Sequence, residues 1–244
     1  MAAVAIITGA SSGIGKATAI RFARERYALS LSGRDEKALA ETSKYVRKLE
    51  QQVSVSLLVI SAFFQMHRNF SRIPLSSIIT FTPCGNVIDA DLDLYDRQMD
   101  VNVRSVIQLT RLVLPHLIKS KGTIVNVSSI TGPCPFAGVT YYCMSKAALD
   151  QFTKCLALEM APHGVRVNSV NPGLIVTNVH RRAGMDETSY KAFLEKGKVT
   201  HALGRVGEAS EVAEAILFLA SGKSSFTTGE LLRVDGGRGL MHPR

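Results

Sequence analysis

The sequence predicts a single α/β domain, built on a doubly wound parallel sheet with helices on both faces. Three observations carry this prediction. Short apolar segments rich in β-branched residues recur along the chain, helical segments alternate with them, and a glycine-rich turn follows the first of the strands. The 244 residues are 46% hydrophobic, which is enough for a sizeable core. Since no linker, repeat or low-complexity tract interrupts the chain, the sequence predicts one domain over residues 1–244.

The first strand and helix illustrate the pattern. Val4–Ile7 is apolar and β-branched and is bounded by glycine, whereas the segment after the turn has apolar residues at helical spacing. The same reasoning extends along the chain. Strands are predicted at Val4–Ile7, Tyr27–Ser32, Val53–Ile60, Thr123–Val127, Val165–Val170 and Glu230–Val234, and helices at Gly15–Glu25, Lys37–Leu49, Tyr142–Met160 and Glu211–Leu219.

Several classes of protein are disfavoured by the composition. No apolar run reaches the roughly 18 residues that suggest a membrane span. The N-terminus lacks the layout of a signal peptide, because Val4–Ile7 already ends in Thr8-Gly9. The four cysteines form no CxxC pair, and no HExxH is present. We therefore expect a cytoplasmic protein with reduced, mostly packed thiols and without a metal site.

The chain is basic, with a net charge of +9. Such a surface can attract nucleic acid, anionic lipid or a phosphorylated ligand. The basic residues are scattered, however, and Arg181-Arg182 is the only adjacent arginine pair. No nucleic-acid-binding signature accompanies them. A solvated surface with a basic pocket for an anionic small molecule explains the charge more simply, so neither nucleic acid nor membrane is expected as a partner.

The turn after the first strand can bind a dinucleotide. Its sequence is Thr8-Gly9-Ala10-Ser11-Ser12-Gly13-Ile14-Gly15, between a predicted strand and a predicted helix. Glycines let the backbone turn tightly and approach a pyrophosphate, whose charge is stabilised at the helix N-terminus. The candidate binding residues are Gly9, Ser11, Ser12, Gly13, Ile14 and Gly15. A glycine-rich turn alone is also compatible with a simple tight connection.

Two later motifs carry side chains suited to proton transfer. Tyr142 and Lys146 are four residues apart, so they share one face of a helix, and a nearby ammonium is expected to lower the tyrosine pKa toward neutrality. Ser129 ends Asn126-Val127-Ser128-Ser129 at the carboxyl end of a predicted strand, where open parallel sheets bind ligands. Taken singly, these motifs could be a surface pair and a loop serine.

Together, in this order, the three motifs resemble the short-chain dehydrogenase/reductase family. Tyr142 follows Ser129 by 13 residues, as the family pattern requires. Asn102 matches the family's helix asparagine, and Asn171-Pro172-Gly173 with Thr177 matches the loop that meets the nicotinamide. The resemblance covers nearly the whole chain except about residues 61–88, and it is strongest to members of the 3-oxoacyl-carrier-protein reductase type.

This resemblance implies a Rossmann-like fold, usually in a homotetramer or homodimer. The cofactor half would span about residues 1–120, and the catalytic and substrate half about residues 121–244. Tyr142 would act as general acid toward a carbonyl (or as base toward an alcohol), with Ser129 polarising the substrate oxygen. Lys146 would hold the nicotinamide ribose, and Asn102 would hold a water that links Lys146 to solvent. The cofactor-binding residues would include Tyr142, Lys146, Pro172, Gly173 and Thr177.

The end of the second strand favours NADP(H) over NAD(H). Where members that prefer NAD place a carboxylate, this sequence has Gly33, and Arg34 follows it. An arginine can bond a 2′-phosphate through charge-assisted hydrogen bonds. Asp35 comes one residue too late in this alignment, although a shift in register would restore it.

One segment departs from the family pattern. The usual Asn-Asn-Ala-Gly after the fourth strand is best matched here by Thr82-Pro83-Cys84-Gly85, and Pro83 suits a central strand poorly. Either the segment has diverged while the site survives, or it impairs the cofactor pocket. The alternative to an enzyme is then a catalytically impaired family member that serves as a binding or regulatory protein. Residues 178–200 are expected to form a lid, and they do not identify the substrate.

Overall fold

The computed structural model describes residues 3–51, 58–59, 85–178 and 184–241. The chain divides into two compact units, each described by itself below. The first comprises Met1–Ile78 and Ala209–Leu217, and the second comprises Ile79–Glu208 and Phe218–Arg244. Most of the atypical segment, including Pro83, lies outside the described residues.

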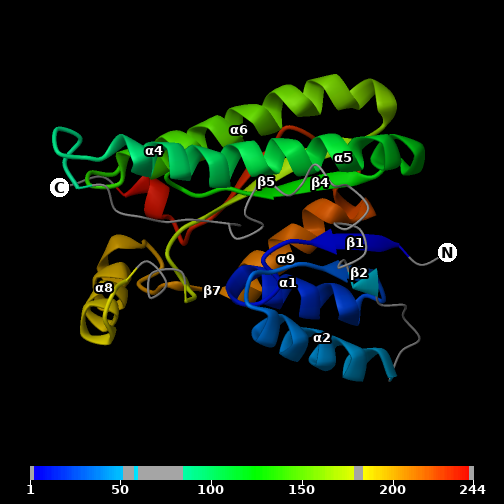
Figure 1. The fold of residues 1–244 in the computed structure, drawn as a ribbon, viewed down its shortest axis with the longest axis horizontal. Coiled ribbons are helices and arrows are strands. Elements are labelled where there is room, and N and C mark those ends of the chain that lie inside the picture. The colour runs from blue at the N-terminus through cyan, green and yellow to red at the C-terminus, as the bar shows by residue number, and fades with distance from the viewer. Residues whose placement is uncertain (1–2, 52–57, 60–84, 179–183, 242–244) are drawn as a thin grey trace. The chain divides into compact units, whose positions relative to one another are not determined.

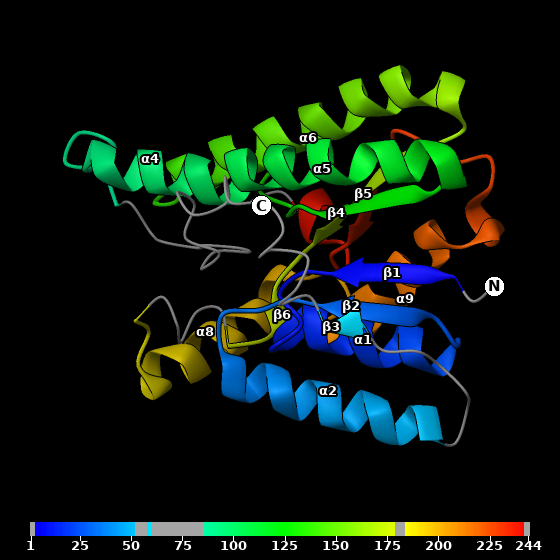
Figure 2. The same cartoon turned by 45° about the vertical axis from the view of Figure 1, so that its right-hand side comes forward.

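The first unit contains a parallel sheet in the order β1-β2-β3. The strands are β1 (Val4–Ile7), β2 (Ala28–Leu31) and β3 (Leu58–Val59), and the helices are α1 (Gly13–Arg24), α2 (Glu36–Gln51) and most of α9 (Ala209–Ala220). Figures 1 and 2 show α1 and α2 on the same side of β1 and β2. Their apolar faces form the core of this unit, with Ala19, Phe22, Leu29, Leu31 and Val46 all buried.

The second unit contains a parallel sheet in the order β4-β5-β8, together with a short parallel pair, β6 and β7. These strands are β4 (Thr123–Val127), β5 (Arg166–Pro172), β8 (Leu231–Val234), β6 (Ile175–Val176) and β7 (Gly207–Glu208). The helical elements are α4 (Leu92–Met99), the π-helical turn η2 (Asp100–Arg104), α5 (Ser105–Ser120), α6 (Thr140–Met160), α8 (Glu187–Thr200) and the 3-10 turns η3 (Ala161–His163), η4 (Gly222–Ser224) and η5 (Arg238–Leu240).

Helices α5 and α6 lie on one side of β4 and β5 (Figures 1 and 2). Between them, Leu156, Ala157, Val165 and Val167 form a buried apolar cluster. Leu114, Leu117, Ile124, Phe152 and Met160 pack against this cluster from both helices and from β4. This core fixes α6 against the strands and so positions the residues at their carboxyl ends.

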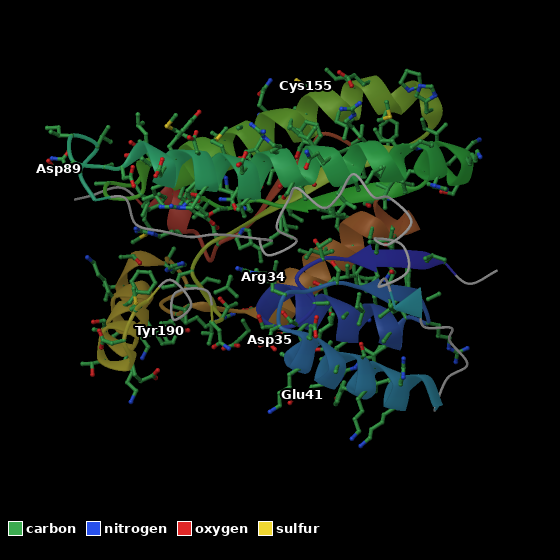
Figure 3. All side chains as sticks on the ribbon, viewed as in Figure 1. Arg34, Asp35, Glu41, Asp89, Cys155 and Tyr190 are labelled. Atoms are coloured by element: carbon green, nitrogen blue, oxygen red, sulfur yellow. The ribbon has the colours of Figure 1, made fainter. Side chains whose placement is uncertain are left out.

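The predicted α/β architecture is confirmed, and β1 and β4 have the predicted bounds. The continuous helical stretch Leu92–Ser120, formed by α4, η2 and α5, is not among the helices predicted by residue range. Cys155 is exposed (Figure 3), so the expectation of packed thiols is wrong at this residue. Within the described ranges, no helix is both long and apolar enough to cross a bilayer. A single domain stays a prediction.

Arg166 is expected to be a major stabilising residue of the second unit. Its guanidinium donates to the carbonyl oxygens of Leu219 (2.9 Å), Ser221 (3.0 Å) and Thr227 (3.3 Å), and to the hydroxyl of Ser224 (2.9 Å). Replacing it with methionine keeps an apolar stem but removes all four of these donated hydrogen bonds, so the carbonyl oxygens keep only their bonds from Ser224 and Asn168. We expect Arg166→Met to lower the free energy of unfolding by about 2–4 kcal/mol, measured by urea denaturation. Arg233→Met, at an exposed position on β8, is the control and should change it by less than about 0.5 kcal/mol.

Candidate active site

Ser129 and Tyr142 meet at the carboxyl end of β4. The pairing of β4 with β5 continues past Val127, since Ser128 N donates to Val170 O and Ile130 N donates to Pro172 O, both at 2.9 Å. Ser129 is thereby held in place, and its hydroxyl accepts from Thr131 N at 3.1 Å. The same hydroxyl is hydrogen-bonded to that of Tyr142, near the start of α6. Both side chains are buried. The Ser129 and Tyr142 hydroxyls, both able to donate a proton in a hydrogen bond, thus lie side by side.

Burial determines the charge state of Tyr142. Loss of solvent raises the pKa of Tyr142 to about 12, and the hydrogen bond with Ser129 only partly opposes this. The expected lowering of this pKa toward neutrality is therefore wrong for this structure. The phenol is protonated at neutral pH, so Tyr142 is a proton donor in the ground state.

Lys146 is the most deeply buried of the predicted catalytic residues, with 1% of its surface exposed. Its Nζ donates to Val127 O at 3.0 Å and lies 5.6 Å from the centre of the Tyr142 ring. Burial lowers the pKa of Lys146 to about 8, and the charge of Asp150 opposes that shift. The predicted i,i+4 pair is confirmed as neighbours on one buried face of α6. The amine therefore titrates much closer to neutrality than an ordinary lysine.

Asn102 lies in the π-helical turn η2, which joins α4 to α5. Its Nδ2 donates to Gln98 Oε1 and to Ser145 Oγ, both at 3.0 Å. Ser145 Oγ in turn donates to Tyr142 O at 2.8 Å. Single π-helical turns inside α-helices often mark functional positions. Asn102 thus bonds α6 at Ser145, which precedes Lys146 and is hydrogen-bonded to Tyr142, and its role in holding a water stays a prediction.

The predicted nicotinamide loop begins at the end of β5. Pro172 pairs with Val234, and Gly173 N donates to Val234 O at 3.0 Å. A Cβ at Gly173 would lie 2.9 Å from both Asp235 Cα and His201 Nε2, so only glycine fits here without a shift. Thr177 follows β6, and its carbonyl oxygen accepts from the hydroxyl of Tyr190 on α8 at 3.0 Å (Figure 3). The loop is therefore anchored at both ends.

The glycine-rich turn lies in the first unit and has the shape that close backbone approach requires. Gly9 and Gly13 have φ angles of 70° and 54°, which favour glycine. A Cβ at Gly15 would lie 2.3 Å from Gly9 O, so the start of α1 packs directly on the turn. Ser12, the N-cap residue, makes no side-chain hydrogen bond to the helix. Ser11 is buried in this turn, and Ser12 and Ile14 are partly exposed. The backbone of the turn has the form that a pyrophosphate at a helix N-terminus needs.

The β2–α2 loop contains the residues predicted to select the cofactor. A Cβ at Gly33 would lie 3.0 Å from both Cβ and Oγ of Ser11, so a longer side chain there would crowd the turn. Arg34 is exposed. Asp35 Oδ1 accepts from Ala38 N at 3.0 Å and so caps α2 (Figure 3). A one-residue shift in the alignment would have placed the Asp35 carboxylate beside the adenosine ribose. In the structure this carboxylate caps α2.

Sequence reasoning missed Asp150, which lies four residues after Lys146. It is 5% exposed and accepts hydrogen bonds from Asn171 Nδ2 at 3.1 and 3.0 Å. The available signal was a carboxylate on the apolar face of a helix, in line with Tyr142 and Lys146.

Comparison with known proteins agrees with this geometry. The family described as "Enoyl-(Acyl carrier protein) reductase" matches residues 9–238. A 3-oxoacyl-(acyl-carrier-protein) reductase of Thermotoga maritima is 34% identical, over 96% of this chain and 96% of its own. The chain belongs to the short-chain dehydrogenase/reductase family. This family of oxidoreductases also includes a meso-2,3-butanediol dehydrogenase of Serratia marcescens, 33% identical over 96% of this chain and 93% of its own.

The same family relationship is seen among solved structures. A short-chain dehydrogenase/reductase of Caenorhabditis elegans, crystallised with cofactor, superposes with a TM-score of 0.84 and is 33% identical. The match covers 98% of this chain and 96% of that one. A likeness of this extent shows that the short-chain dehydrogenase/reductase fold predicted for this chain is correct.

Proposed function

We propose that this protein is an NADP(H)-dependent oxidoreductase that interconverts a carbonyl and an alcohol. The observation that carries the proposal is the buried cluster at the carboxyl end of β4, where the Ser129 and Tyr142 hydroxyls are hydrogen-bonded and Lys146 lies beside the Tyr142 ring. Bound nicotinamide would supply the hydride. Gly9, Gly13 and Gly15 would receive its pyrophosphate, with Pro172, Gly173 and Thr177 near the ring.

The side chains of the cluster can divide the proton chemistry between them. Hydride addition places negative charge on the carbonyl oxygen, so donors already directed at that oxygen lower the barrier. Ser129 accepts from Thr131 N and keeps its own proton to donate. Tyr142, protonated at neutral pH, would transfer its proton to the oxygen as the general acid. The Lys146 ammonium would stabilise the phenolate that remains, and Asn102 would connect the site to solvent for resupply of the proton.

The substrate would be a ketone, an aldehyde or a 3-oxoacyl thioester. The direct assay measures the rate at which the purified protein oxidises NADPH in the presence of each member of a panel of carbonyl compounds. The panel includes a small hydroxyketone and a 3-oxoacyl thioester. Turnover with one of them supports the proposal. If the folded protein bound NADPH but oxidised none of these, the proposed reaction would be wrong and a binding or regulatory role would be favoured.

Arg34 is expected to set the preference for NADP(H). Arg34→Ala should weaken NADPH binding about tenfold or more, because it removes a charge-assisted hydrogen bond to the 2′-phosphate, while NADH binding changes less than about twofold. Dissociation constants for both cofactors test this. Arg47→Ala, at an exposed arginine on α2, controls for the loss of one positive charge. Equal weakening of NADPH and NADH by Arg34→Ala would count against the assignment.

The expected homotetramer or homodimer and the cytoplasmic location stay predictions.

A further inference from the structure

The buried carboxylate of Asp150 has no role in the chemistry above. Tyr142, Lys146 and Asp150 follow one another at intervals of four residues, so they line a single face of α6. Their exposed fractions are 7%, 1% and 5%. Asp150 and Asp235 are the two acidic side chains that are buried in the described part of the chain. A buried carboxylate costs free energy unless it is bonded and paired, so its partners indicate why it is there.

The hydrogen bonds of Asp150 lead to the two segments that form the site. Asn171 Nδ2 donates to both carboxylate oxygens, and the same Nδ2 donates to the backbone oxygen of Ser129 at 2.9 Å. The Ser128 hydroxyl also bonds the carboxylate. A Cβ at Gly132 would lie only 2.0 Å from Asp150 Oδ2, so the turn after Ser129 closes directly over the carboxylate. Asp150 thus joins α6 to the end of β4 and to the end of β5.

The charges around this pair are few. Asp150 is the charged group that acts on Lys146, and Lys146 and Lys154 are those that act on Asp150. Tyr142 is neutral, and the β4 and β5 groups that face the pair are serines and asparagines. The elements packed against α6 carry their other charges elsewhere. On α4, η2 and α5 they are at exposed positions, those on α5 being Arg111, His116 and Lys119. Arg166 on β5 bonds Leu219 and Ser221, and His163 on η3 is exposed. The charged side chains on α4 and η2 are Asp93, Asp96, Arg97, Asp100 and Arg104.

We infer that Asp150 is a positioning residue for the proposed reaction: its carboxylate keeps the Lys146 ammonium charged and anchors the turn that carries Ser129. The effect on the charge of Lys146 follows from Coulomb's law. Two opposite charges one helical turn apart are only weakly screened when both are buried. Loss of the carboxylate charge would favour the neutral amine. The inference rests on the proposed function for its catalytic meaning, but the charge of Lys146 can be measured without catalysis.

The first test is a titration of Lys146 in the intact protein. Lysine labelled with ¹³C at Cε reports the charge of each amine by NMR, and the Lys146 signal is identified by its absence in Lys146→Arg. Asp150→Asn keeps the shape of the side chain and an acceptor for Asn171 but removes the charge. The Lys146 transition should then move to lower pH, by on the order of one pH unit. Asp235→Asn, at the other buried aspartate, is the matched control and should leave it in place.

The second test is the pH dependence of turnover. If Lys146 acts as an ammonium, activity falls as pH rises through its pKa, so the alkaline limb of the kcat profile in Asp150→Asn should move to lower pH with the NMR transition. A Lys146 transition at the same pH in wild type and Asp150→Asn would overturn the inference, whatever the activity. Wild-type protein that binds NADPH without turnover would instead overturn the proposed function, while the NMR result would still decide the role of Asp150.

Discussion

Replacing Tyr142 with phenylalanine is expected to reduce kcat by about a thousandfold, because general acid catalysis by one positioned group contributes roughly 10²–10⁴-fold. The ring stays beside Lys146, and only the hydroxyl that bonds Ser129 is lost. NADPH affinity should change by less than about threefold, since this hydroxyl is assigned to proton transfer. Steady-state kinetics together with an NADPH titration measure both quantities.

The neighbouring residue provides the control for this substitution. Tyr141 is also buried, and its hydroxyl donates to Ala90 O at 3.4 Å while its ring contacts Tyr95 edge-on. Tyr141→Phe removes the same atom from the same helix without touching the cluster, so it should retain most of the activity. Turnover in Tyr142→Phe that matches Tyr141→Phe would show that another group supplies the proton.

Replacing Gly15 with alanine is expected to weaken binding of both cofactors by about a hundredfold. The added Cβ would lie 2.3 Å from Gly9 O, 2.5 Å from Gly9 C and 2.9 Å from Thr8 O, and all three are backbone atoms. The turn must therefore move away from α1, and a cofactor site tolerates displacements of only about 0.5 Å. Fluorescence titrations with NADPH and NADH measure the loss, with circular dichroism to establish that the variant is folded.

Gly222→Ala is the matched control for this prediction. A Cβ at Gly222 meets no atom within 4 Å, so it should leave the affinity for both cofactors and the stability unchanged. Normal cofactor binding by a folded Gly15→Ala protein would mean that the glycine-rich turn is only a tight connection between β1 and α1.

The sequence predicted the parts of the structure that depend on local pattern. The strand bounds at β1 and β4 follow from short apolar runs ended by polar or glycine residues, and the pairing of Tyr142 with Lys146 follows from helical spacing. Ser129, Asn102 and the glycine-rich turn were identified through the order of motifs along the chain. These are the features that one-dimensional spacing encodes.

The features that the sequence did not predict depend on burial. Spacing alone placed an ammonium near Tyr142 and so suggested a lowered pKa, whereas the enclosed site raises it. Asp150 was overlooked because a charged residue is usually exposed, and its partners Ser128 and Asn171 lie on separate strands or just beyond them. The π-helical turn at Asn102 likewise has no local signal in the sequence, and it lies where α4, α5 and α6 come together.

Cofactor binding by the wild-type protein tests the central claim most directly. The chain has no tryptophan, so the enhanced emission of bound NADPH can be followed with little interference from the protein. The account predicts saturable NADPH binding, with NADH bound about tenfold or more weakly, because Arg34 follows Gly33 and Asp35 caps α2. Failure of the folded protein to bind either cofactor would contradict the account and favour a catalytically impaired, non-enzymatic member of the family.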